Sequence, residues 1–440
     1  MEAKETIDPW VFTRREDDPF SAPLKNSMDL DPLIKRIDNA EYVLLGEASH
    51  GTHEYYTWRT AITKRLIVEK GFSFIAVEGD WPDCYKINQY IKGYSDEKNI
   101  TEVLKTFDRW PSWMWANWEI ASLAEWLKEY NKDQPDGKKV GFYGLDVYSL
   151  WDSMSSIMKY FKDKDPQATA IAKNAIECFE PYNEEGHNYA RANYYNLEEC
   201  QDEVVDLLTM VRKKASFTYI DGEEALNAEQ NAFIAVNAER YYRSMISFGG
   251  ESWNIRDIHM VDTLNRLVNF HGKESKAIVW EHNTHIGDAR FTDMKEGGMV
   301  NVGQLVREQQ GEENVVLVGF GCYKGTVIAG SAWGKPMKRK NVPPARKGSF
   351  EEIIHSERPE NRIFIFDKKN KDERFNNKIL PHRAIGVVYH PENEKHGNYV
   401  PTRVSSRYDA FVYLEETKAL FPLHLQPDGD KMPDTYPFGF

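Results

Sequence analysis

The chain contains the stretch Tyr42-Val43-Leu44-Leu45-Gly46-Glu47-Ala48-Ser49-His50-Gly51, in which an apolar run ends in a polar turn. Four consecutive apolar residues before a turn are typical of a buried strand. The arrangement recurs far along the chain, where Ala277-Ile278-Val279-Trp280 precedes His282-Asn283-Thr284-His285. In a parallel sheet both polar segments leave the carboxyl ends of strands, which is the edge where ligands bind. The two segments therefore predict an active site.

The segments around these two alternate between strand and helix, as in parallel βαβ units. The pattern from 149 to 269 is almost wholly helical, with short breaks near Pro181 and Ile220. The predicted strands are 42–45, 72–77, 140–145, 276–280, 315–320, 326–329, 363–366, 384–389 and 410–414. The predicted helices between the first three strands are 54–69, 83–91 and one that ends at 129.

These elements predict an α/β fold, with a mainly parallel central sheet flanked by helices. The helical stretch is expected to be an insertion or lobe that forms one wall of a deep cleft. We expect a single unit over residues 1–440. Its predicted parts are an N-terminal α/β part (30–148), a helical lobe (149–270), a C-terminal α/β part (271–422) and a tail (423–440).

The composition excludes several classes of protein. Of the 440 residues, 41% are hydrophobic and 13% aromatic, which is enough to bury a large core. A net charge of −13 argues against binding to nucleic acid or to an anionic membrane, since phosphate binding needs clustered Lys and Arg. No stretch approaches the roughly 20 apolar residues of a membrane span, and the first residues lack the apolar region of a signal peptide. We therefore expect a soluble, cytoplasmic protein.

The four cysteines, Cys84, Cys178, Cys200 and Cys322, show no CxxC spacing. We expect buried free thiols, and neither a disulfide framework nor a thiolate metal site. The basic run from Lys335 to Lys340 is interpreted as a solvated loop.

The first polar turn carries the residues of a general base. Glu47 and His50 lie close enough for the carboxylate to orient the imidazole, and a histidine with a pKa near neutrality suits this role. Ser49 does not lie in a G-x-S-x-G elbow, so water is the more economical nucleophile. Arg59, on the following helix, would bring a permanent positive charge to the same edge, where it would hold a carboxylate or stabilise an oxyanion.

Two acidic residues, Glu78 and Asp80, end the next strand and are expected at the same rim. Each polar group also has a structural interpretation: Glu47 would cap a helix, and His282 and His285 would be hydrogen-bonded edge histidines. Their occurrence together at strand ends favours a functional site.

A metal site is a further alternative, because imidazole and carboxylate are ordinary ligands of zinc and manganese. Away from the strand ends, Trp113 and Trp115 are candidates for an aromatic wall that contacts a bulky apolar ligand. Arg256 is a candidate for a side chain that faces the substrate, although an ion pair with Asp257 is its simplest interpretation.

Several ordered motifs carry a resemblance to a known family. They are LLGEASHGTHEYYTWR (44–59), VEGDWPD (77–83), WPSWMWANWE (110–119), GFYGLDVYSLWDSM (141–154), NAERYYRSM (237–245), WNIRDIHM (253–260), VWEHNTHIGDAR (279–290) and GFGCYKGTVIA (319–329). On these motifs the chain resembles the erythromycin esterase family over nearly its whole length, from Leu33 to Leu423.

The resemblance implies a hydrolase whose sheet is surrounded by helices. In this family a histidine in the GE-x-x-H turn is understood to activate water for attack on an ester carbonyl, without an acyl-enzyme and without a metal. By similarity, the active-site residues are His50, Glu47, Arg59, Glu78 and His285, with His282 as the neighbour of His285.

Two departures from the family pattern concern the substrate. Macrolide-inactivating members have an aromatic residue directly after the motif histidine and lack the Trp-Pro-Asp after the second strand. This chain has Gly51 and Trp81-Pro82-Asp83 at these places. It looks closer to the widespread bacterial branch, so the resemblance links it to antibiotic response without implying that macrolides are its substrate.

We therefore predict a bacterial hydrolase that cleaves a small-molecule carboxylic ester or lactone without a cofactor. His50 would be the general base and Glu47 would orient it. Arg59 and His285 would stabilise the oxyanion, and Glu78 would complete the polar network. The predicted substrate-binding residues are His282, Asp80, Trp113, Trp115 and Arg256.

Two alternatives stay open. The first is a metal-dependent hydrolase with Glu47, His50, Glu78 and His285 as the ligands of a divalent cation. The second is a non-catalytic small-molecule-binding protein. The sequence does not indicate the oligomeric state.

Overall fold

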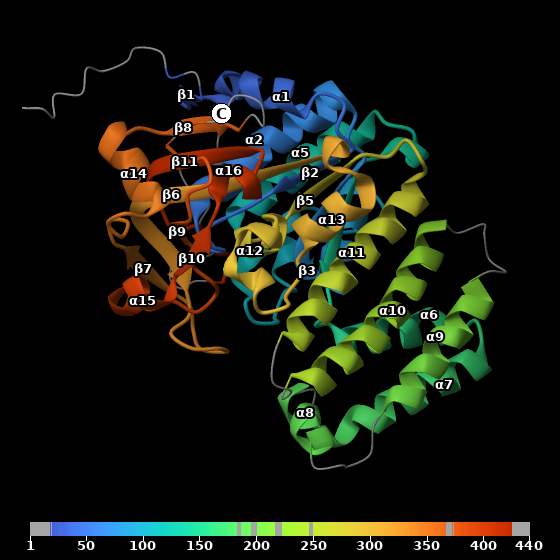
Figure 1. Ribbon diagram of the computed structural model, residues 1–440. Helices are drawn as coiled ribbons and strands as arrows, with labels where there is room; N and C mark the ends of the chain where they lie inside the picture. Colours follow the sequence, from blue (N-terminus) through green and yellow to red (C-terminus); the bar gives the residue numbers. More distant parts are fainter. Residues whose placement is uncertain are drawn as a thin grey trace, which may run out of the picture.

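A central sheet organises the molecule. The computed structural model describes residues 18, 20–182, 186–194, 200–215, 222–245, 250–366, 372 and 374–424. The strands of the sheet are β1 (Ser21–Pro23), β2 (Tyr42–Leu45), β3 (Phe74–Asp80), β4 (Gly141–Asp146), β5 (Ala277–Trp280), β6 (Val315–Ala329), β7 (Lys338–Val342), β8 (Arg362–Ile365) and β11 (Ala410–Thr417). Within the described residues they form a nine-stranded sheet in the order β1-β8-β11-β6-β2-β5-β3-β4, with β7 paired to β6 (Figure 1).

The pairing of the inner strands is parallel. β2 pairs in parallel with β5 and β6, β3 with β4 and β5, and β11 with β6, whereas β1, β7 and β8 pair antiparallel. β9 (Leu380–Arg383) and β10 (Tyr399–Thr402) form a separate antiparallel pair. The prediction of a mainly parallel sheet is confirmed.

Both faces of the sheet are buried by helices. On β2, Val43 and Leu45 face a core shared with α2 (His53–Lys70), α3 (Trp81–Lys92) and α5 (Trp118–Lys132). Tyr42 and Leu44 face the opposite core, which includes α11 (Glu251–His271) and α13 (Val302–Gln310). A strand covered on both faces is continuously apolar, which is why 42–45 reads as an unbroken apolar run. The other short helices are α1 (Asp31–Ile37), α4 (Ile100–Leu104), α12 (Asn283–Ile286), α14 (Phe350–Glu357), α15 (Glu394–Gly397) and α16 (Val404–Arg407).

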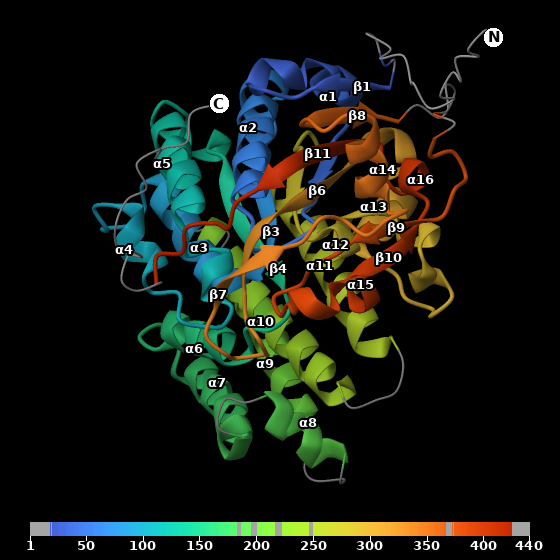
Figure 2. The same ribbon diagram turned by 90° about the vertical axis from the view of Figure 1, so that its left-hand side faces the viewer.

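Five further helices form a lobe that lies to one side of the sheet in both views (Figures 1 and 2). They are α6 (Leu150–Phe161), α7 (Pro166–Phe179), α8 (Gly186–Tyr194), α9 (Gln201–Ala215) and α10 (Gly222–Ser244). The last helix of the predicted lobe (149–270), α11, instead covers the sheet. The lobe shares a core with the sheet, because Phe179 and Ala232 belong to the same buried cluster as Leu44 and Val279. The predicted break near Pro181 is confirmed between α7 and α8, and the one near Ile220 lies outside the described residues. None of the helices in the described part of the chain has the length and apolar character that a membrane span requires.

Three predictions about strands and loops are wrong. Segments 315–320 and 326–329 are parts of one strand, β6, whose later residues also pair with β7. In the basic run, Lys338 to Lys340 belong to the edge strand β7. The exposed side chains of Lys338 and Arg339 discourage pairing with another chain, whereas Lys340 Nζ donates to the Gly330 carbonyl oxygen at 2.9 Å. The segment 384–389 is no strand and forms only isolated bridges at Ile385 and Val388.

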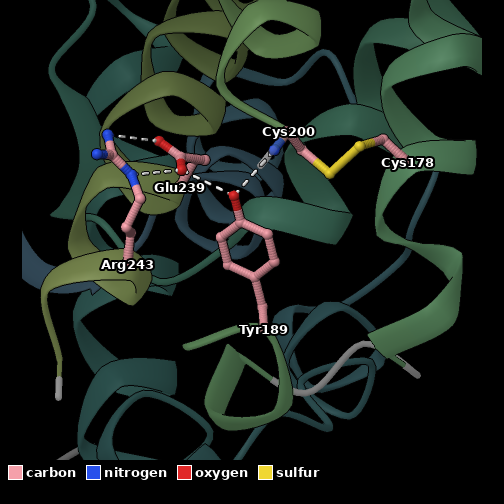
Figure 3. The surroundings of a disulfide bond; sticks show 5 residues. All are labelled: Cys178, Tyr189, Cys200, Glu239 and Arg243. Carbon is pink, nitrogen blue, oxygen red and sulfur yellow. Dashed lines mark hydrogen bonds and ion pairs between the residues drawn. A yellow bond between two sulfur atoms is a disulfide. The ribbon is translucent and has the colours of Figure 1, made fainter. Parts of the chain in front are cut away.

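A disulfide joins two helices of the lobe. Cys178 lies in the last turn of α7 and bonds to Cys200, which directly precedes α9 (Figure 3). The prediction of free thiols is therefore wrong for this pair, and it is confirmed for Cys84 and Cys322, which are free and buried. Disulfides persist in oxidising compartments and are rare in the cytosol. The cytoplasmic location stays a prediction.

Candidate active site

The carboxyl ends of four neighbouring parallel strands, β2, β5, β3 and β4, bring six predicted polar residues together with Asp146, which the sequence did not single out. These residues are Glu47 and His50 after β2, Glu78 and Asp80 in β3, Asp146 in β4, and His282 and His285 after β5. This edge is where open α/β sheets bind ligands. The two polar segments that are far apart in the sequence therefore lie at one site.

His50 is held by a carboxylate that is itself held by a guanidinium. The His50 Nδ1 atom lies 2.9 Å from Glu47 Oε1, and Arg59 Nη2 donates to Glu47 Oε2 over 2.6 Å. The Arg59 side chain has no exposed surface, and its guanidinium lies over the rings of Tyr56 and Trp280 at 4.5 and 4.6 Å. Arg59 thus lies behind Glu47, against Tyr56 and Trp280, where it supports the carboxylate. This position differs from the oxyanion role expected from the sequence.

The surroundings of His50 favour its charged form. Burial by itself lowers the pKa of His50, but the negative charge of Glu78 and the hydrogen bond and charge of Glu47 outweigh it, so the pKa is raised. Because Nδ1 bonds to Glu47, the Nε2 atom is the ring nitrogen left to exchange a proton. A raised pKa also strengthens the ring as a base when it is neutral.

Glu78 is bonded at both of its oxygens. Its Oε2 accepts the backbone N–H of His282 at 2.8 Å, and its Oε1 accepts Arg256 Nη2 at 2.8 Å. Burial raises the pKa of Glu78, but the charges of His285, His50 and Arg256 outweigh it and hold this pKa well below its ordinary value. Glu78 therefore brings a negative charge to the site and fixes the turn after β5.

Arg256, on α11, reaches the site from the opposite side. Its Nε and Nη2 atoms donate to the two oxygens of Asp146 at 2.9 and 2.6 Å, and its guanidinium lies over the Tyr148 ring. The expected ion pair between Arg256 and Asp257 does not form among the described contacts. Neighbouring residues on a helix point in different directions, so each finds its own partner.

The partner of Asp257 is His285. Both Asp257 oxygens lie 3.0 Å from His285 Nδ1, and the His285 ring stacks on Trp253 with centroids 4.5 Å apart. The other ring nitrogen, Nε2, lies 3.1 Å from Arg256 Nη1. Nε2 also lies 3.4 Å from Glu78 Oε1, so both ring nitrogens of His285 are engaged with protein groups and neither is free for an oxyanion. Sequence reasoning missed Asp257 as its partner.

Asp80 lies toward the outside of this edge and pairs with Arg109 at 3.1 Å, a residue that the sequence did not single out. Burial is the main cause that raises the pKa of Asp80 to about 6. Trp113 and Trp115 are buried in the hydrophobic core, and the Trp115 indole donates to the Glu78 carbonyl oxygen at 3.0 Å. Their burial gives no support to the predicted aromatic wall, and it makes Trp115 a support for β3.

His282 is adjacent to His50, with ring centroids 4.9 Å apart and planes tilted by 40°. Its Nδ1 atom contacts the Thr284 hydroxyl at 2.8 Å and the Thr284 backbone nitrogen at 3.3 Å. Its Nε2 atom is buried and has no hydrogen-bond partner among the described residues. Burial, followed by the charges of His50 and His285, holds the pKa of His282 well below its ordinary value.

The acidic and imidazole groups are not arranged as a metal site. Within the described ranges, no group of three or more His, Cys, Asp or Glu side chains is placed to hold a metal ion. Glu47 and Glu78 each bond to an arginine, and His285 bonds to Asp257. The side chains suit proton transfer and charge stabilisation.

The fold and the site together define an α/β protein that gathers acid–base residues at the carboxyl edge of a parallel sheet. The chain belongs to the erythromycin esterase family, whose model matches residues 67–417. Membership indicates a hydrolase that acts on a small molecule. The matched range includes Glu78, Asp257 and His285, whereas Glu47, His50 and Arg59 precede it.

A relative and three solved structures are similar to the chain. Erythromycin esterase type II of Escherichia coli is 26% identical over 372 residues, which cover 79% of this chain and 86% of that protein. The structure of a succinoglycan biosynthesis protein has a TM-score of 0.72 at 24% identity, covering 91% of this chain and 95% of that one. The structure of a Bacillus cereus protein has a TM-score of 0.72 at 19% identity, and the match covers 92% of this chain and 97% of that one. The structure of a mutant erythromycin esterase in its open conformation has a TM-score of 0.62 at 16% identity, and the match covers 90% of this chain and 95% of that one. At these identities the solved structures show the fold alone.

Proposed function

We propose that the protein hydrolyses a carboxylic ester or lactone by direct attack of water, with His50 as the general base. The observation that carries this proposal is the chain Arg59–Glu47–His50, which orients the imidazole and leaves Nε2 as its only free ring nitrogen. Membership of the erythromycin esterase family and the name of the Escherichia coli relative support an ester as the substrate.

In the proposed reaction, His50 Nε2 accepts a proton from water while the water oxygen attacks the carbonyl carbon. The imidazolium that forms is stabilised by Glu47, as a buried carboxylate stabilises the histidine of a catalytic triad. Collapse of the tetrahedral intermediate breaks the bond to the alcohol oxygen, and His50 returns the proton to this leaving group. The products are one carboxylic acid and one alcohol, or a hydroxy acid from a lactone.

Water suits the role of nucleophile better than Ser49. The Ser49 hydroxyl is buried and hydrogen-bonds to the Thr52 hydroxyl. Among the described residues it makes no hydrogen bond with His50 or with another base, whereas an attacking serine must pass its proton to an adjacent base. Direct hydrolysis therefore needs fewer changes in the observed contacts than an acyl-enzyme does.

Gly51 bears on the acceptance of macrolides. A Cβ atom at this position would lie 2.0 Å from the carbonyl oxygen of Ile328, which belongs to β6. The backbones also bond here, since the Ile328 N–H donates to the Gly51 carbonyl oxygen at 3.0 Å. An aromatic residue after the motif histidine does not fit this backbone, so simple esters and lactones are the first substrates to test. A role in antibiotic response stays a prediction.

The test is hydrolysis of short-chain aryl esters, lactones and macrolides by the wild type and by His50→Asn. Asparagine keeps a polar group near Nδ1 for Glu47 but has no base at the Nε2 position. We expect kcat to fall by about 10²- to 10⁴-fold, the usual contribution of a general base. The exposed His390 provides a matched control, and His390→Asn should keep wild-type rates. Wild-type rates in His50→Asn would refute the proposal.

Chelation distinguishes the metal-dependent alternative. The proposed reaction uses no cofactor, so exhaustive treatment with a chelator should leave kcat unchanged. Loss of activity that added zinc or manganese restores would instead support a metal-dependent hydrolase. A wild-type protein that binds these compounds without turnover would support the non-catalytic alternative.

A further inference from the structure

The position of His282 between β5 and α12 determines where its ring lies. His282 is the residue that caps α12, and its ring accepts from the backbone N–H of Thr284. Its own backbone N–H donates to Glu78 Oε2 at 2.8 Å. The turn is therefore held at two points, and the His282 ring has little freedom to rotate away from His50.

The cap also determines the tautomer of His282. A backbone N–H can only donate, so the Nδ1 atom that faces Thr284 N must offer a lone pair. A neutral imidazole with an unprotonated Nδ1 has its proton on Nε2. Burial and the neighbouring charges keep the ring neutral, because they lower the pKa of His282. The Ala48 carbonyl oxygen favours the charged form, but it makes no hydrogen bond with Nε2.

The result is an N–H donor without a partner beside the proposed base. His282 Nε2 is buried and unpaired within the described part of the chain, and the two rings are 4.9 Å apart between centroids. An unpaired buried donor is costly, and such a group is often satisfied by a ligand. Arg256 is already engaged with Asp146, Glu78 and His285. Arg59 Nη2 bonds to Glu47, and the two other guanidinium nitrogens of Arg59, although unpaired among the described residues, belong to a group that lies over the Tyr56 and Trp280 rings.

We propose that His282 donates its Nε2–H to the carbonyl oxygen of the ester, and that this hydrogen bond strengthens as the oxygen becomes an oxyanion. This inference rests on the proposed function of His50. The two histidines then divide the reaction: His50 Nε2 takes the proton of the attacking water, and His282 Nε2–H stabilises the charge that the attack creates. A fixed dipole in a buried site is an efficient stabiliser, because it needs no reorganisation during the reaction.

Two variants distinguish the capping role of His282 Nδ1 from the proposed donor role of Nε2–H. In His282→Asn the side-chain oxygen replaces Nδ1 as the cap of α12, and asparagine is among the best N-cap residues. Its amide is too short to replace the Nε2–H. In His282→Gln the longer side chain brings an amide N–H close to the Nε2 position and gives up the cap.

We expect kcat of His282→Asn to fall by about 10²- to 10³-fold with little change in KM, as for the loss of one oxyanion donor. His282→Gln should retain at least about tenfold more kcat than His282→Asn, although it is the less conservative change at the cap. The acidic limb of the pH profile should remain in both, because His50 is untouched. Wild-type kcat in His282→Asn, or a glutamine variant no better than the asparagine variant, would overturn the inference.

A measurement without turnover tests the tautomer. In wild-type protein labelled with ¹⁵N-histidine, NMR should show His282 as a neutral ring protonated on Nε2, with no titration between about pH 5 and 8, where an unperturbed histidine titrates. Protonation on Nδ1, or titration in this range, would contradict the inference while leaving the role of His50 intact. Failure of the wild type to hydrolyse any ester would remove the proposed function and this inference together.

Discussion

Arg59 and His50 bond to opposite oxygens of the same buried carboxylate, Glu47, at 2.6 and 2.9 Å. The guanidinium lies on the core side and the imidazole on the side of the proposed reaction. The buried Glu47 carboxylate therefore faces the permanent positive charge of Arg59 on one side. The position of the proposed base depends on a residue that never reaches the substrate.

Removing the Arg59 charge should affect both stability and rate. In Arg59→Met the Glu47 carboxylate stays buried without its main partner, and breaking a buried pair in this way costs about 3–5 kcal/mol. We expect urea denaturation to show a loss of this size in the free energy of unfolding. We also expect kcat to fall by about tenfold, a fraction of what a general base contributes. Arg59→Lys keeps the charge and should lie between wild type and Arg59→Met in both measurements.

The acidic limb of the pH profile should report the environment of His50. The pKa of His50 is raised by Glu78 and Glu47 against the effect of burial, and the base must be neutral to act. Activity should therefore fall as the pH decreases through a pKa above the ordinary histidine value. Glu78→Gln removes one of the raising charges, so this limb of log kcat/KM should move to lower pH.

Asp80→Asn is the matched control for Glu78→Gln. It also removes a carboxylate at the end of β3, but Asp80 pairs with Arg109 and is not among the main influences on His50. The acidic limb of log kcat/KM in Asp80→Asn should lie at the same pH as in the wild type. An unmoved limb in Glu78→Gln would show that the pKa in the profile belongs to another group.

The sequence predicted the strands and polar turns at this edge of the sheet well, because the burial of each strand residue determines the apolar pattern. The boundaries of β2 match the apolar run 42–45, since each residue of the run faces one of two cores. Glu47 and His50 are three residues apart, so their contact follows from one turn. The convergence of the turns after β2 and β5 follows from parallel pairing of these strands.

Contacts that depend on tertiary packing were not predictable in the same way. Asp257 meets His285 only because α11 crosses the end of β5, and Asp146 lies 110 residues from its partner Arg256. The direction of Arg59 into the core depends on the rings of Tyr56 and Trp280. The strand β7 lacks an apolar alternation because it lies at an exposed edge, so no pattern marked it.

The disulfide should stabilise the helical lobe. Its cysteines are 22 residues apart in sequence, and closing a loop of this size contributes about 3 kcal/mol. The Cys200 amide also donates to the Tyr189 hydroxyl, which donates to Glu239 (Figure 3), so both bonds hold the start of α9. A reductant should lower the Tm of the wild type and leave unchanged the already lower Tm of the Cys178→Ser/Cys200→Ser variant. An equal Tm for the two proteins without reductant would contradict this role.

The hydrogen bonds of Asp257 make its amide variant informative. Asp257 Oδ1 also accepts the Val302 backbone N–H at 3.1 Å, so in Asp257→Asn the side-chain oxygen should stay there and the amide N–H should face His285 Nδ1. The His285 proton would then move to Nε2, where it meets the donor Arg256 Nη1. We expect kcat to fall by at least about tenfold, but by less than the roughly 10⁴-fold cost of inverting the tautomer of the base itself. Asp262→Asn, on the exposed face of the same helix, is the control that should keep wild-type kcat. Equal kcat values for the two variants would show that the His285 tautomer has no part in turnover.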